Sequence, residues 1–144
     1  MNDTSSQAEI RTIIEARAKA AGTGDIDAMM ADVADDVMVF DVVDPLRRAG
    51  KALSRERAIK WQESYGRPPT WENRDVAVTV DGDVAFSHAL SHVTGKLKTG
   101  GEIDMWFRTT LGFRRISGRW LIVHDHGSAP FDPESGKASL GLRP

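Results

Sequence analysis

Asp41 is the first residue whose type and position suggest chemistry. It ends a short β-rich run, and in a strand Val37, Val39 and Asp41 lie on one face. A carboxylate on an apolar face is costly unless it has a partner or a function. Burial raises the pKa of a carboxylate and makes it a better base near neutral pH. Two alternatives stay open: Asp44 is the functional acid instead, or Asp41 is a capping or ion-paired residue at the end of the strand.

All four histidines fall in the second half of the chain, at His88, His92, His124 and His126. His88 shares a strand face with His92 and two apolar residues, which suits either an acid–base partner or a hydrogen-bonded histidine of the core. His124 and His126 share another face. Such a pair on a strand can bind Zn²⁺ when a carboxylate adds a third ligand. Because nothing else in the sequence supports a metal, we predict no metal site.

Arginines supply the second candidate chemistry. Arg108 shares a strand face with Trp106 and Thr110, and Arg17 is in step with the apolar residues of the first predicted helix. The planar guanidinium suits a ligand carboxylate or carbonyl oxygen. For Arg108, an ion pair with an acidic side chain or exposure to solvent is an equally open alternative, and Arg17 could also lie on a solvent-exposed face.

Two aromatic residues, Trp61 and Tyr65, are four residues apart in a predicted helix, so they lie on the same side of it. They either line a pocket or pack in the core. The chain has no nucleophile elbow, no phosphate-binding glycine loop and no dinucleotide fingerprint. It also has no cysteine, which excludes disulfides and thiol nucleophiles.

Periodicity divides the elements that would position these residues into helices first and strands afterwards. A capping box at Ser6 and Glu9 begins a first helix, a second short helix follows Asp25, and a third begins at Ser54. The sequence predicts strands over residues 37–41, 71–80, 84–93, 102–115 and 119–126, the last four as an antiparallel meander. This order is typical of an α+β fold with helices on one face of a curved sheet.

The composition is that of a globular protein. The chain has 144 residues, 40% of them hydrophobic and 28% charged, with a formal net charge of −2. This size predicts one domain, residues 1–131, and residues 132–144 are expected to form a loosely held tail. The charge balance argues against nucleic acid as a partner. No run is long and apolar enough for a membrane helix, and the polar start is unlike a signal peptide, so we expect a cytoplasmic protein.

The chain resembles the nuclear-transport-factor-2-like superfamily, which includes the ketosteroid isomerases and SnoaL-like polyketide cyclases. Two stretches carry the resemblance, residues 22–41 (GTGDIDAMMADVADDVMVFD) and residues 106–132 (WFRTTLGFRRISGRWLIVHDHGSAPFD). It covers roughly residues 7–132 and implies a cone in which a curved antiparallel sheet wraps helices around an apolar cavity. The other face of the sheet usually forms a homodimer, and the last strand agrees with this because both of its faces are apolar.

The resemblance assigns roles to the candidate residues. Asp41 takes the place of the aspartate that shuttles a proton in the ketosteroid isomerases, and His88 turns inward as its possible partner. The cavity-lining residues it implies are Arg17, Trp61, Tyr65, Trp106, Arg108, Thr110 and His126. The isomerases hold the enolate oxygen with a tyrosine and a protonated aspartate, where this chain has Arg17 and a residue at or near Thr110. A steroid isomerase with that oxyanion hole is therefore not expected.

Two functions follow from these observations. The first is an isomerase, cyclase or dehydratase that moves a proton beside a carbonyl, without a metal or organic cofactor. The second is a non-catalytic ligand-binding or dimeric assembly module of the same fold. Asp41 discriminates between them, because a general base needs a carboxylate free of cationic partners, whereas a binding module predicts an arginine-paired one.

Overall fold

A computed structural model describes residues 3–144 and shows three helices and six strands. The helices are α1 (Asp3–Thr23), α2 (Ile26–Met30) and α3 (Lys51–Glu63). The strands are β1 (Val33–Phe40), β2 (Arg48–Ala49), β3 (Thr70–Asp81), β4 (Val84–Lys96), β5 (Glu102–Ile116) and β6 (Arg119–Ser128). This order confirms the predicted α+β class, and the third helix begins at Lys51 rather than at Ser54.

The first two helices are joined by a tight turn. Gly24 has φ 73°, a conformation that glycine adopts without steric cost. Asp25 then caps α2, because its side chain accepts a hydrogen bond of 3.0 Å from the Ala28 backbone N–H. The predicted capping box at Ser6 and Glu9 is wrong: α1 is already helical from Asp3, and Ser6 is buried within it.

The six strands form one curved, open sheet in the order β2-β1-β6-β5-β4-β3. Strands β3 to β6 pair antiparallel with their neighbours along the chain, as the meander prediction requires. Strand β1 runs parallel to β6 and starts at Val33, four residues before the predicted start. Asp35 and Asp36, expected to lie before the strand, are exposed residues within it, where the pairing with β6 changes register.

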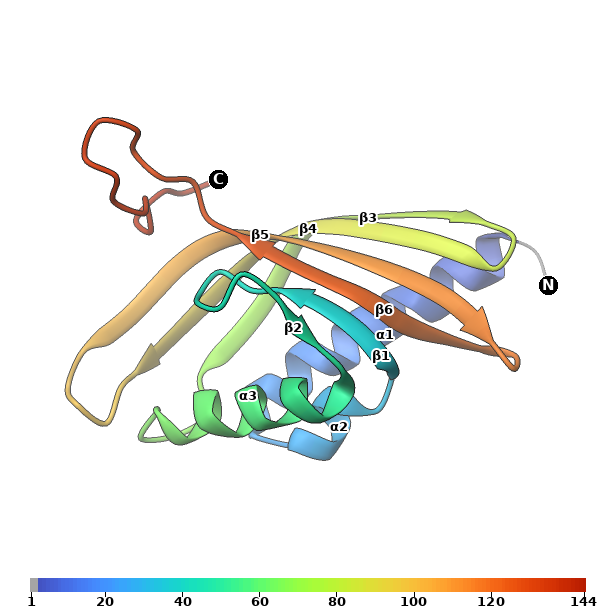
Figure 1. The fold of residues 1–144 in the computed structure, drawn as a ribbon, viewed down its shortest axis with the longest axis horizontal. Coiled ribbons are helices and arrows are strands. Elements are labelled where there is room, and N and C mark those ends of the chain that lie inside the picture. The colour runs from blue at the N-terminus through green and yellow to red at the C-terminus, as the bar shows by residue number, and fades with distance from the viewer. Residues whose placement is uncertain (1–2) are drawn as a thin grey trace.

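One face of the sheet is covered and the other is bare. Figure 1 shows α1 running beneath the sheet, with α2 and α3 below the end that carries β1 and β2. The core lies between these layers, where Ile10 of α1, Phe113 of β5 and Ile122 of β6 are almost fully buried. Throughout, the covered face is called the inner face and the bare face the outer face.

The C-terminal segment, residues 129–144, leaves the end of β6 and loops outward on the side away from the helices (Figure 1). The side chain of Asp132 accepts hydrogen bonds from the Glu134 backbone N–H and the Ser135 hydroxyl. Arg143 donates two hydrogen bonds, of 2.9 and 3.0 Å, to the carboxylate of Asp104 on β5. The looseness expected for residues 132–144 stays a prediction.

Candidate functional site

A cavity of about 230 Å³ lies between the inner face of the sheet and helices α1 and α3. Small side chains leave room for it: Ser87 and Ala89 lie on the inner face of the long strand β4. Most of the lining is aliphatic or aromatic, with Val37, Val39 and Leu111 among the lining residues. A cavity of this kind suits a small, largely apolar molecule.

Asp41 lies at the cavity directly after β1 and is held by three donors. Its Oδ1 accepts a hydrogen bond of 2.7 Å from the Val42 backbone N–H. Its Oδ2 accepts one of 3.3 Å from Arg48 Nη1 of β2 and lies 3.4 Å from Arg57 Nε of α3. Asp41, Arg48 and Arg57 are here called the arginine end of the cavity. A carboxylate with this many cationic and N–H partners is an ion-paired group rather than a free base.

A second ion pair crosses the cavity from helix to sheet. Arg17 of α1 donates a hydrogen bond of 3.2 Å to Asp125 Oδ2 of β6, and its Nε donates to the Met29 backbone carbonyl at 3.4 Å. About a quarter of each charged side chain of the pair is exposed, 23% for Arg17 and 26% for Asp125. The structure thus places Arg17 at the cavity, as expected, but with a protein carboxylate already beside it.

Four aromatic rings form one wall of the cavity through edge-to-face contacts. Trp61 contacts both Tyr65 and Trp71, with ring centroids 5.6 and 5.7 Å apart, and Trp71 contacts Phe107 at 5.3 Å. Burial raises the pKa of the Tyr65 hydroxyl, and the nearby charge of Arg57 opposes that shift. The wall contains both aromatic residues predicted from the third helix, Trp61 and Tyr65, and each lines the cavity.

A row of polar side chains crosses β3, β4 and β5 on the inner face. Asn73 Oδ1 accepts hydrogen bonds from the Trp71 indole N–H at 3.1 Å and from the Ser91 hydroxyl at 2.8 Å. Ser91, which is fully buried, also lies 2.8 Å from the hydroxyl of Thr109. Asn73, Trp71 and Thr109 line the cavity, so this polar row belongs to its wall.

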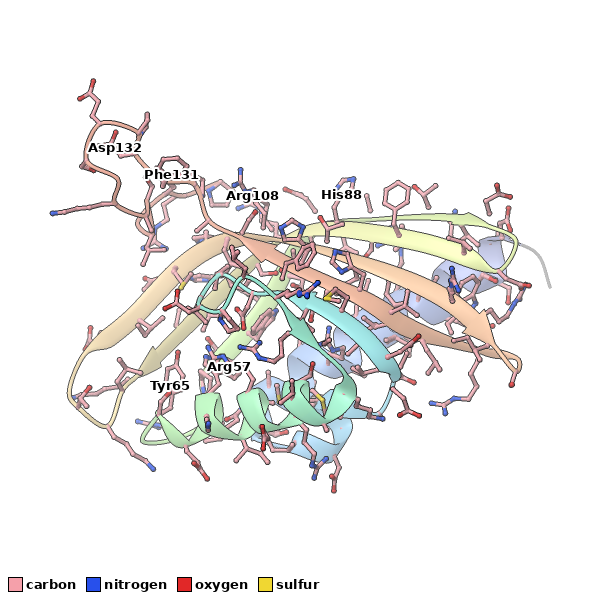
Figure 2. The ribbon with its side chains drawn as sticks, viewed as in Figure 1. Arg57, Tyr65, His88, Arg108, Phe131 and Asp132 are labelled. Carbon is pink, nitrogen blue, oxygen red and sulfur yellow. The ribbon has the colours of Figure 1, made fainter. Side chains whose placement is uncertain are left out.

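The face predicted for β5 is wrong. Trp106, Arg108 and Thr110 were expected to line the cavity, but the lining residues of this strand are the alternate ones, among them Phe107 and Thr109. A shift of one residue moves every side chain of a strand to the other face. Figure 2 shows Arg108 and His88 on the bare outer side of the sheet, whereas Arg57 and Tyr65 lie on the helix side.

The histidines expected at the cavity also lie elsewhere. His88 is opposite Thr110 on the outer face, so it is far from a position beside Asp41, and it does not line the cavity. His126 is exposed and packs edge-on against Phe40 at 5.4 Å, while the Nδ1–H of His124 donates to the Met38 carbonyl at 2.7 Å. Within residues 3–144, no group of three metal-ligating side chains is close enough to hold an ion.

Polar and charged side chains gather on the outer face around His92. Its Nδ1 lies 2.8 Å from Glu72 Oε1 and its Nε2 lies 2.7 Å from Asp104 Oδ1, and its ring stacks on Trp106. Only the imidazolium has an N–H on both ring nitrogens, so the charged ring satisfies both carboxylates. Hydrogen bonds to Asp104 and then to Glu72 raise the pKa of His92, and Arg143 and then His92 lower that of Asp104.

We expect the free energy of unfolding to fall as pH rises through the raised pKa of His92. The stabilisation that the charged His92 ring supplies is complete below the ordinary histidine pKa of about 6.5. It is lost as the pH rises through the higher pKa of His92 in the folded protein. Urea denaturation from about pH 5 to about pH 9 measures the slope, which His92→Gln should flatten. His88→Gln, on the same face of β4, is the control. An unchanged slope in His92→Gln would contradict the assignment.

Sequence patterns could have found some of the lining residues that were missed. Arg57 precedes Trp61 by four residues, so the helix face that carries Trp61 extends back to it. Asp125 lies between His124 and His126, so in a strand its side chain points to the opposite face from theirs. Phe107 and Thr109 belong to a mainly apolar set of alternate residues on β5. No comparable signal marked three other polar lining residues, Arg48, Ser54 and Asn73.

Comparison with known proteins places this geometry in a family. Residues 10–132 match the model of the SnoaL-like domain. A crystal structure of an NTF2-like protein of unknown function from Pseudomonas putida KT2440 is 31% identical, covers 99% of both chains and has a TM-score of 0.90. A ketosteroid isomerase-like protein from Erwinia carotovora atroseptica SCRI1043 is 24% identical over 84% of this chain and 93% of its own, with a TM-score of 0.72.

The name of a further structural relative states its fold. An NTF2-like protein with a cystatin-like fold from Novosphingobium aromaticivorans is 21% identical over 90% of this chain and 85% of its own, with a TM-score of 0.72. No protein in a search of curated proteins matches the chain. No described helix is long and apolar enough to cross a membrane.

Proposed function

The chain belongs to the SnoaL-like family of NTF2-like proteins, and on that premise we propose that its cavity binds a small, mainly apolar molecule with one anionic or carbonyl oxygen. The oxygen lies at the arginine end and the apolar body lies against the aromatic wall. The observation that carries this proposal is the convergence of Arg48 and Arg57 on a single carboxylate at the cavity.

The balance of charge at the cavity supports an anionic group. Three arginines and two aspartates are found among its described lining residues: Arg17, Arg48, Arg57, Asp41 and Asp125. Arg48 and Arg57 share one carboxylate, so this pair retains an unbalanced positive charge. The side chain of Arg57 is 31% exposed and that of Arg48 only 10%, which makes Arg57 the more accessible partner for a ligand oxygen.

The size of the cavity limits the body of the ligand. About 230 Å³ is below the roughly 300–1,000 Å³ of sites for drug-sized molecules, which favours a compound of one or two rings. Edge-to-face stacking on Trp61, Trp71 and Phe107 would favour an aromatic or flat alicyclic body. Benzoate and 2-naphthoate are therefore suitable first probes.

We expect aromatic carboxylates to raise the melting temperature, and Arg57→Leu to weaken that effect. A ligand at 100 times its dissociation constant adds about 2.7 kcal/mol of stability. Losing one hydrogen bond to a charged group costs about 1.5–3 kcal/mol, which weakens binding about tenfold or more. Thermal unfolding with benzoate, 2-naphthoate and neutral naphthalene measures the effect in each variant.

Arg108→Leu is the matched control, because it removes the same charge from the outer face. Its response to carboxylates should equal that of the wild type. Stabilisation by naphthalene alone would contradict the arginine-anchored site, and so would a loss of carboxylate binding in Arg108→Leu with normal binding in Arg57→Leu.

Proton transfer beside a carbonyl is a second candidate function. The observation that favours it is the position of Asp41, which lies 3.4 Å from Arg57, the most exposed of the three arginines that line the cavity. A ligand oxygen that takes Arg57 as its partner leaves Asp41 with one donor fewer, beside the ligand. Asp41 would then accept a proton from the carbon next to the carbonyl, while Arg57 stabilises the enolate oxygen.

For this second candidate, we expect bound acetophenone, which has a carbonyl but no carboxylate, to exchange its methyl protons with D₂O faster than in buffer. Proton NMR follows the loss of the methyl signal. Asp41→Asn removes the base, and a positioned general base typically accelerates proton transfer about 10²–10⁴-fold. Exchange at the buffer rate with the wild-type site saturated would leave ligand binding as the function and reject the catalytic role.

We also propose a homodimer formed through the outer face of the sheet. On β4 this face carries Val84 and Phe86, which are 57% and 49% exposed. Large exposed apolar side chains on one sheet face favour a symmetric partner. A cytoplasmic location remains part of the proposal; the cysteine-free sequence suits a reducing compartment.

Light scattering after gel filtration should give twice the mass of one chain for the wild type and a lower mass for Phe86→Glu. The substituted carboxylate would be desolvated at the interface. Phe131→Glu is the matched control, because Phe131 is exposed on the C-terminal segment beyond the sheet. A monomeric wild type, or a Phe86→Glu variant that remains dimeric, would contradict this interface.

A further inference from the structure

Asn73 has a side chain whose orientation can be deduced from its neighbours. It lies on β3, opposite Ser91 of β4, and Ser91 is in turn opposite Phe107 of β5. The indole N–H of Trp71 is a donor only, and it lies 3.1 Å from Asn73 Oδ1. The amide group would place two N–H groups against each other if it were flipped, so the oxygen must face Trp71.

The direction of the other hydrogen bonds in the polar row follows from this orientation. The Ser91 hydroxyl has one proton and donates it to Asn73 Oδ1. The hydroxyl of Thr109 must therefore donate in the second bond, in which it is 2.8 Å from Ser91. The proton direction runs from Thr109 through Ser91 to Asn73, and both bonds to Asn73 end on its oxygen.

This arrangement leaves the amide nitrogen of Asn73 available. Its two N–H groups have no hydrogen-bond partner among residues 3–144. The side chain lines the cavity, and Asn73 is only partly buried. A half-buried amide whose oxygen is fixed and whose nitrogen is free is a positioned donor, which suits a ligand oxygen that accepts hydrogen bonds.

We propose that the Asn73 amide binds a carbonyl oxygen of the ligand, which makes the ligand class a carboxylic acid that also carries a ketone or similar carbonyl. This inference rests on the proposed function, which places the carboxylate at the arginine end. Arg48 lies on β2 and Asn73 on β3, at opposite edges of the sheet. The two oxygen groups of the ligand are therefore at opposite ends of its apolar body.

Matched pairs of probes test this recognition. In 4-acetylbenzoate and 6-acetyl-2-naphthoate, a carbonyl lies at the far end from the carboxylate, and 4-ethylbenzoate and 6-ethyl-2-naphthoate replace that carbonyl with a methylene. Two ring lengths are used so that one can span the distance between the two ends. Titration calorimetry should show that the acetyl compound of at least one pair binds about three- to tenfold tighter, as expected for one net hydrogen bond.

The variant Asn73→Asp tests ligand recognition while it keeps the hydrogen bonds that hold the side chain in place. Aspartate keeps an oxygen that accepts from Trp71 and Ser91, but it replaces the two amide donors with a second acceptor. At pH 8 its carboxylate is ionised, and the preference for the acetyl probe should fall to one or below. Glu72→Gln is the control, because it replaces a carboxylate with an amide at the neighbouring residue, whose side chain lies on the outer face. This variant should keep the wild-type preference for the acetyl probe.

The outcomes distinguish this inference from the proposed function. Equal binding of acetyl and ethyl compounds in both pairs, with affinity still dependent on Arg57, overturns the role of Asn73 and leaves the arginine-anchored site standing. An acetyl preference that persists in Asn73→Asp also overturns it. If none of the four carboxylates binds the wild type, both proposals fail together.

Discussion

The constraint on which this molecule depends is that one face of its sheet must be covered by helices, so the register of each strand decides which side chains reach that face. The helices cover that face (Figure 1). On it, β4 carries small side chains, among them those of Ser87 and Ala89, which line the cavity. The curved sheet and the helices therefore enclose space that side chains do not fill. Because side chains alternate along β5, the same register that buries Phe113 also decides which residues of this strand line the cavity.

Charge inside this cavity is tolerated because each carboxylate has an arginine. Asp41 is paired with Arg48 and Arg57, and Asp125 with Arg17. Such pairs neutralise the carboxylates when the cavity is free of ligand. Asp41 keeps Arg48 and the Val42 backbone N–H when Arg57 turns to a ligand oxygen, so that carboxylate is not left unpaired. Asp41 contacts two arginines and a backbone N–H. These partners stabilise its charged form, so it is better suited to organising a binding site than to acting as an unassisted base.

Most of the architecture could be predicted from the sequence, since the helical periodicity, the strands of the predicted meander and the resemblance to the family all agree. The face of β5 could not, because both sets of alternate residues contain aromatic and threonine side chains. Contacts on the inner face, those of Phe107 with Trp71 and of Thr109 with Ser91, hold one set there. Strand β4 misleads for a related reason: its larger residues, including Phe86, face outward. The partners of Asp41 come from β2 and α3, and no pattern local to Asp41 reveals them.

In the proposed complex, a ligand oxygen binds at the arginine end of the cavity. NMR of protein labelled with ¹⁵N-arginine tests it directly, because each guanidinium Nε–H gives its own signal. On titration with 2-naphthoate, we expect the Arg57 signal to shift and the signal of Arg108 on the outer face to stay unchanged. Saturable binding that shifts Arg108 and leaves Arg57 in place would contradict it.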